Sequence, residues 1–196
     1  MDIKKNRAPA VAGKFYPANR SELEKNIKTH LFSPIPQKQK AIGIVSPHAG
    51  FMYSGDVAGA VYSRIEIPDA VILIGPNHTG YGESISVMTK GTWSMPMGDV
   101  AVDEKLAAII CEQTPITKPD SIAHRFEHSL ETQLPFLQYF KKNFFMVPIC
   151  LKKTDFSICK QLSEGIVKAI KIFEEPVLII ASSDTVSYTH LTLPTK

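Results

Sequence analysis

Four short, continuous apolar runs constrain the fold of this chain more than any other feature of its sequence. Runs that are apolar throughout, instead of alternating with polar residues, are typical of strands buried on both faces of a sheet. Segments with helical patterns separate them. We therefore expect an α/β fold, with a mostly parallel or mixed central sheet and helices on both faces. The runs are residues 41–46, 70–75, 144–150 and 176–182, and residues 84–89 form a further expected strand.

Helix signals fill the intervals between these runs. Ser21 and Glu24 have the spacing of a capping box, which predicts a helix that begins near Ser21. Asp103 precedes a patterned segment as a plausible N-cap residue. The other expected helices cover residues 56–65, 102–113 and about 154–172.

Composition limits the function classes. The chain has 196 residues, 44% of them hydrophobic, so it can bury one sizeable core. Its net charge of 22 − 19 = +3 comes from scattered basic residues, which argues against a nucleic-acid partner. No apolar run approaches the roughly 20 residues that cross a membrane. The three cysteines are odd in number and irregularly spaced, which favours free thiols and a cytoplasmic location.

Two histidines and a carboxylate follow the ends of predicted strands. The run 41–46 leads through Pro47 to His48, the run 70–75 leads through Pro76 to His78, and the run 176–182 leads to Asp184. Ligands of open α/β sheets bind outside the carboxyl ends of the strands. Two histidines and a carboxylate form the ligand set of non-haem Fe(II) oxygenases, and imidazole also suits copper and zinc. The sequence therefore predicts a metal site at this edge.

Each residue also has a simpler interpretation. A single histidine after a strand is more often held by backbone hydrogen bonds than by a metal, although two in the same context favour a shared site. Asp184 could cap a following helix. In residues 127–131, His128 and Glu131 would share one face of a helix and could act together in acid–base catalysis or support a ligand histidine. The alternative is a helix N-terminus whose acidic residues complement the dipole.

Taken together, the motifs of this chain resemble those of the Memo-like family. The resemblance implies a fold similar to class III extradiol, non-haem iron dioxygenases. It makes His48 and His78 metal ligands and places Asp184, His128 and Glu131 in the cleft as catalytic candidates. The segments that carry the resemblance are 7–17 (RAPAVAGKFYP), 46–50 (SPHAG), 53–55 (YSG), 75–78 (GPNH), 97–100 (MGDV) before Asp103, 127–131 (EHSLE) and 182–184 (SSD).

The resemblance also sets expectations for domains, cofactor and partners. Family members supply a further metal-site residue, commonly a cysteine, from a C-terminal part, so we expect the third ligand there. We interpret residues 1–185 as a single Memo-like domain that is incomplete at its C-terminus. Residues 186–196 resemble a translated sequencing adapter and are expected to be a non-native tail. In bacteria and archaea the family is grouped, as AmmeMemoRadiSam system protein B, with AMMECR1-domain and radical SAM proteins.

Two function classes follow from these features. The first is a metal-dependent redox protein that uses iron or copper and acts on an unknown small molecule. The second is a non-catalytic metal-binding protein that keeps a dioxygenase-like cleft and docks a peptide or a sister protein, such as an AMMECR1-domain or radical SAM protein.

Overall fold

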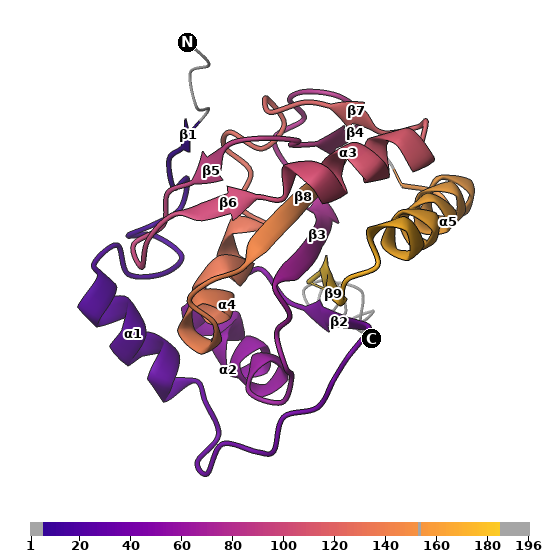
Figure 1. Ribbon diagram of the computed structural model, residues 1–196. Coiled ribbons are helices and arrows are strands. Elements are labelled where there is room, and N and C mark those ends of the chain that lie inside the picture. Colours follow the sequence, from indigo (N-terminus) through magenta and orange to yellow (C-terminus); the bar gives the residue numbers. More distant parts are fainter. Residues whose placement is uncertain (1–5, 153, 185–196) are drawn as a thin grey trace, which may run out of the picture.

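The computed structural model describes residues 6–152 and 154–184, which form one α/β unit around a mixed sheet (Figure 1). The strands of this part of the chain are β1 (Asn6–Arg7), β2 (Gly43–Ser46), β3 (Ala70–Pro76), β4 (Ile85–Val87), β5 (Thr92–Trp93), β6 (Val100–Val102), β7 (Lys118–Pro119), β8 (Phe145–Leu151) and β9 (Val177–Ser182). The helices are α1 (Arg20–Thr29), α2 (Phe51–Tyr62), α3 (Glu104–Gln113), the 3-10 helix η1 (Glu131–Gln133), α4 (Leu134–Phe140) and α5 (Phe156–Phe173).

The four apolar runs form one contiguous part of the sheet, which extends from β8 to the edge strand β2. The strand order is β1-β5-β6-β8-β3-β9-β2, and β8, β3, β9 and β2 are all parallel. Antiparallel pairing is confined to the short strands β4 and β5, which pair with β8 and β6 respectively. The predicted mostly parallel sheet is therefore confirmed.

Helices cover both faces of this sheet, as predicted. Figure 1 shows α3 and α5 on one side and α1, α2 and α4 on the other. Val71, Ile72 and Leu73 of β3 are completely buried between the two layers. Gly165 lets α5 approach α3 closely, because a Cβ atom there would lie 2.0 Å from Oγ1 of Thr114. The continuous apolar runs of β3 and β8 thus reflect strands that are shielded from water on both faces, whereas Val45 of the edge strand β2 is exposed.

The expected N-cap of α3 is confirmed, whereas the starts of α1 and α2 differ from the sequence-based expectations. Asp103 does cap α3, since its side chain accepts a hydrogen bond from the backbone N–H of Leu106. The cap of α1 is Asn19 and not Ser21, because the Asn19 side chain accepts from two backbone N–H groups of the first turn. Helix α2 begins at Phe51, five residues before the expected start.

The described residues contain no helix long and apolar enough to cross a membrane. The three cysteines are free thiols, of which Cys150 is buried and Cys159 is exposed. The expected non-native tail, residues 186–196, lies outside the described residues. The prediction for that tail therefore stays a prediction.

Candidate metal centre

Three parallel strands bring the predicted site residues to one edge of the sheet. His48, His78 and Asp184 each stand two residues beyond the end of a strand, namely β2, β3 and β9. These strands are neighbours in the order β3-β9-β2, so their carboxyl ends open on the same side. The convergence of His48 and His78 that the sequence predicts is confirmed.

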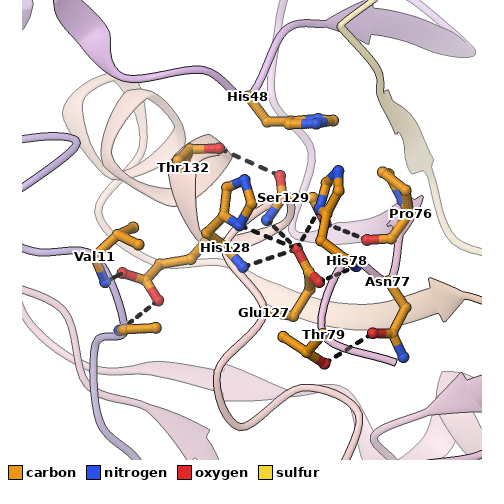
Figure 2. Close-up of polar contacts among 12 residues, drawn as sticks. Val11, His48, Pro76, Asn77, His78, Thr79, Glu127, His128, Ser129 and Thr132 are labelled. Atoms are coloured by element: carbon orange, nitrogen blue, oxygen red, sulfur yellow. Dashed lines mark hydrogen bonds and ion pairs between the residues drawn. The ribbon is translucent and has the colours of Figure 1, made fainter. Parts of the chain in front are cut away.

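A third imidazole completes a compact cluster. One potential ligand atom from each of His48, His78 and His128 lies within 4.8 Å of the other two. The ring centroids of His78 and His128 are 4.7 Å apart, and that of His48 lies 5.2 Å and 5.8 Å from these two. Figure 2 shows the three rings facing a common centre. The chain itself thus offers a third nitrogen ligand, where the sequence analysis looked to a C-terminal part.

Asp184 borders this centre. Its Oδ1 atom accepts a hydrogen bond from the backbone N–H of His48 (2.6 Å), and its Oδ2 atom lies 3.6 Å from Nε2 of the same residue. The first contact fixes the turn after β2, while the second oxygen remains close to the ring nitrogens. Asp184 therefore lies at the site, as predicted, and its carboxylate is placed to act beside a bound ion.

Glu127 joins two of the three histidines from below the rings (Figure 2). Its Oε1 atom lies 2.9 Å from Nδ1 of His78 and 3.4 Å from Nδ1 of His128. The same carboxylate accepts hydrogen bonds from the backbone N–H groups of His78, His128 and Ser129. Only 1% of the Glu127 side chain is exposed. A single buried carboxylate thus organises both His78 and the turn that carries His128.

Burial also shapes the charge state of the cluster. It lowers the pKa of His48, and the neighbouring His78 and His128 rings act in the same direction while Asp184 opposes them. Burial likewise lowers the pKa of His128, against the opposing effect of Glu127. For Glu127, burial raises the pKa, but hydrogen bonds from His78 and from the backbone of Ser129 outweigh it and hold the pKa below its ordinary value. Neutral rings beside an ionised carboxylate are the states that a metal cation requires.

Comparison with known proteins identifies the family of this chain. The sequence model of the family described as "Memo-like protein" matches residues 7–193. The chain belongs to the Memo-like family. A MEMO1 family protein of Archaeoglobus fulgidus is 44% identical over 183 residues, which are 93% of this chain and 68% of the relative. A MEMO1 family protein of Aquifex aeolicus is 43% identical, over 93% of this chain and 67% of the relative. This Memo-like chain therefore spans about two thirds of the length of these relatives.

The donor set of this Memo-like protein fits a transition-metal ion. Metal–nitrogen bonds of about 2.1 Å place adjacent ligand nitrogens about 3 Å apart, so the observed cluster needs only a small inward movement of the rings. The side chain of His78 is 45% exposed, which leaves the centre open to solvent on that side. Imidazole ligands suit zinc, copper, iron and nickel, so the ligand set supports a divalent metal without fixing its identity.

The helical pairing predicted for His128 and Glu131 is wrong. His128 lies in a turn before η1, and α4 begins only at Leu134, with Pro135 in its first turn. Proline is favoured at that position because it needs no hydrogen-bond acceptor for a backbone N–H. Instead of helical acceptors, the Glu127 carboxylate satisfies the N–H groups of His128 and Ser129. The acidic residue that supports the histidines is therefore Glu127.

Glu131 points to the N-terminal segment and not to the rings. Its carboxylate accepts hydrogen bonds from the backbone N–H groups of Ala10 (2.7 Å) and Val11 (3.0 Å) and from the hydroxyl of Tyr16. It also forms a buried ion pair of 2.7 Å with Arg7. No contact in the described part of the chain joins this carboxylate to His128. The structure thus gives Glu131 a bracing position, and its predicted catalytic role stays untested.

A further histidine, His124, lies in the core and outside the cluster. The residue is completely buried, and its Nδ1 atom lies 3.3 Å from Sγ of Cys150. Burial and the nearby Arg7 charge lower the pKa of His124 to about 4. Apolar and charged residues are mixed around His124 in the sequence, so no periodic pattern indicates its burial. Trp93 is also completely buried.

Proposed function

We propose that this Memo-like protein binds a divalent redox metal, iron or copper, and acts on a small molecule at that ion. The observation that carries the proposal is the clustering of His48, His78 and His128, with potential ligand atoms within 4.8 Å of one another. Two imidazoles that follow parallel strands, buried His48 and exposed His78, together with His128 form the kind of ligand set that transition metals prefer. Membership of the family supports a dioxygenase-like cleft around it.

Three protein ligands leave coordination positions free, which is the arrangement of catalytic metal sites. A redox ion bound there would supply one-electron chemistry to a small molecule beside it. In this proposal His48, His78 and His128 would hold the ion, and Oδ2 of Asp184, 3.6 Å from Nε2 of His48, would accept a proton from that molecule or return it. Phe15 packs edge-on against His128, with ring centroids 5.0 Å apart, and excludes water from that side.

A second candidate is a metal-binding protein that docks a partner. Large apolar side chains are exposed on β2 and on the first turns of α2, beside the loop that carries His48. An AMMECR1-domain or radical SAM protein that covers this face would close the metal site without turnover. The exposed residues are Ile42, Val45, Met52, Tyr53 and Val57.

The two candidates differ in whether a bound ion keeps an open position. We would load the purified protein with Fe(II) under anaerobic conditions and record the electron paramagnetic resonance signal of its nitric oxide complex. The proposal expects a signal in the wild type and its loss in His48→Ala, His78→Ala and His128→Ala. His30→Ala is the matched control, because His30 pairs with Asp56 outside the cluster. It should keep the signal.

Iron that binds without forming the nitric oxide complex would favour the docking protein, since its coordination would be closed. Binding of iron and copper no tighter than millimolar, or binding unaffected by all three substitutions, would refute the metal centre. Circular dichroism of each variant separates ligand loss from unfolding.

A further inference from the structure

We infer that Glu127 and Ser182 are positioning residues that fix the tautomers of all three histidines. Each ring carries its proton on Nδ1, on the protein side, and presents the Nε2 lone pair to the centre before any ion arrives. The inference deepens the proposed metal centre, because it states how this chain prepares the centre. It rests on the direction of individual hydrogen bonds.

Glu127 determines the tautomer of His78 and favours the same one in His128. A carboxylate can only accept hydrogen bonds. Its Oε1 atom lies 2.9 Å from Nδ1 of His78, so this nitrogen must carry the proton. Nδ1 of His128 lies 3.4 Å from the same oxygen without forming a hydrogen bond, and at that distance the negative charge attracts a proton and repels a lone pair. Both rings are therefore left with a bare Nε2 atom.

Ser182 determines the tautomer of His48 by exclusion. The Ser182 hydroxyl has one proton, and it donates that proton to the carbonyl of Ser129 (2.6 Å). Towards every other partner the hydroxyl oxygen can only accept. Nδ1 of His48 lies 3.0 Å from this oxygen and must therefore be the donor. Nε2 of His48 is then unprotonated as well, because its nearest acceptor, Oδ2 of Asp184, lies 3.6 Å away and beyond hydrogen-bond distance, whereas the Ser182 oxygen lies 3.0 Å from Nδ1.

Gln133 holds the hydroxyl in this orientation. The Gln133 amide nitrogen donates to the carbonyl of Pro47 (2.8 Å) and to Oγ of Ser182 (2.9 Å). The amide cannot be reversed, because its oxygen would then face the Pro47 carbonyl. In the observed orientation that oxygen accepts from the buried hydroxyl of Tyr62 (2.7 Å). The chain of bonds from Tyr62 to Ser182 is therefore consistent in direction at every step.

A hydrogen bond to the ring nitrogen that does not bind the metal holds a ligand histidine in the orientation and protonation state that a metal needs. Here two residues do this for three ligands. A ring whose Nε2 carried the proton would have to lose it, or rotate, before binding. Removing either partner should therefore weaken metal binding roughly 10–100-fold even where the three histidines remain.

The decisive measurement uses the metal-free wild-type protein. Long-range ¹H–¹⁵N correlation spectra of histidine-labelled protein distinguish the two neutral tautomers directly, and single histidine variants assign the signals. At a pH where the rings are neutral, we expect His48, His78 and His128 all as the Nδ1–H form. An Nε2–H form at any one of the three histidines in the wild type would overturn the inference without reference to any variant.

Variants then assign the cause. Glu127→Gln should mix the tautomers of His78 and His128 and leave His48 unchanged, whereas Ser182→Ala should affect His48 alone. Glu66→Gln and Ser163→Ala remove the same groups at exposed positions and should change none of the three. Tautomers that do not respond to either site variant would refute the positioning roles. Correct tautomers combined with no metal binding would refute the proposed function and leave this inference standing.

Discussion

Replacing Glu131 by glutamine tests whether this residue braces the fold or takes part in chemistry. The substitution keeps the volume of the side chain and removes its charge. In the wild type the carboxylate receives four donors, from Arg7, Ala10, Val11 and Tyr16. Burial and the adjacent carboxylate raise the pKa of Tyr16, so its hydroxyl stays protonated and donates.

The magnitude follows from the burial of the ion pair. Side-chain exposure is 4% for Arg7 and 0% for Glu131. Removing one partner of such a pair leaves a buried, uncompensated charge and costs about 3–5 kcal/mol. We expect Glu131→Gln to lower the free energy of unfolding by this amount. Because Arg7 also donates to the carbonyls of His124 and Glu127, part of its desolvation remains compensated, which favours the lower end of the range.

The assay is urea unfolding followed by circular dichroism, arranged as a double-mutant cycle with Arg7→Met. The loss of unfolding free energy in the double variant should be smaller than the sum of the losses in the two single variants. Each single variant leaves one buried charge without its partner, whereas the double variant removes both charges. Additive effects, or a loss below 1 kcal/mol for Glu131→Gln, would refute the bracing role. A stable Glu131→Gln protein with full metal affinity but no turnover would instead support the catalytic role predicted from the sequence.

Three further predictions concern pH, packing and metal. Burial lowers the pKa of His124 to about 4 in the folded chain, from 6.5 in the unfolded chain. Below pH 6.5 the unfolded chain therefore binds a proton that the folded chain does not, and the unfolding free energy falls until the pH reaches about 4. The loss is about 3 kcal/mol, and the unfolding free energy of His124→Gln should lack this part of the pH dependence. Gly165→Ala, normally favourable within a helix, should destabilise by about 1–3 kcal/mol in urea unfolding, because its Cβ would meet Thr114 at 2.0 Å. Fe(II) at 100 times its dissociation constant should stabilise the wild type by about 2.7 kcal/mol in thermal unfolding under anaerobic conditions, and should not stabilise His78→Ala.

The core of this fold was predictable because its longest strands, β3 and β8, are buried on both faces. Burial of that kind leaves a continuous apolar run, and all four runs became the parallel strands β2, β3, β8 and β9. The short strands β5 and β7 have two residues each, too few to show any period. Their positions depend on pairing with distant segments. The start of α2 at Phe51 was missed because Gly50 and Gly55 lie on either side of its first turn, and such a pattern favours a turn.

The candidate site was partly predictable for a related reason. His48, His78 and Asp184 follow strand ends directly, so the topology of a parallel sheet places them together. His128 comes from a turn, and its position depends on hydrogen bonds that no periodicity records. The adjacency of Glu127, His128 and Ser129 was the available signal, but a helical interpretation of this segment directed attention to Glu131. Ser182 was visible as the last residue of an apolar run and the first of the segment 182–184, but neither pattern indicated a contact with His48.

Arg7 explains why the N-terminal segment and the metal centre form one structural unit. Its guanidinium donates to the carbonyl of Glu127 (2.6 Å), forms an ion pair with Glu131 and lies 3.9 Å from the centre of the Trp93 ring. The two glutamates therefore face opposite ways from one short turn. Glu127 holds the histidines, and Glu131 holds the segment whose Phe15 packs on His128. A change at Arg7 should for this reason reach the ligand rings, although Arg7 contacts none of them.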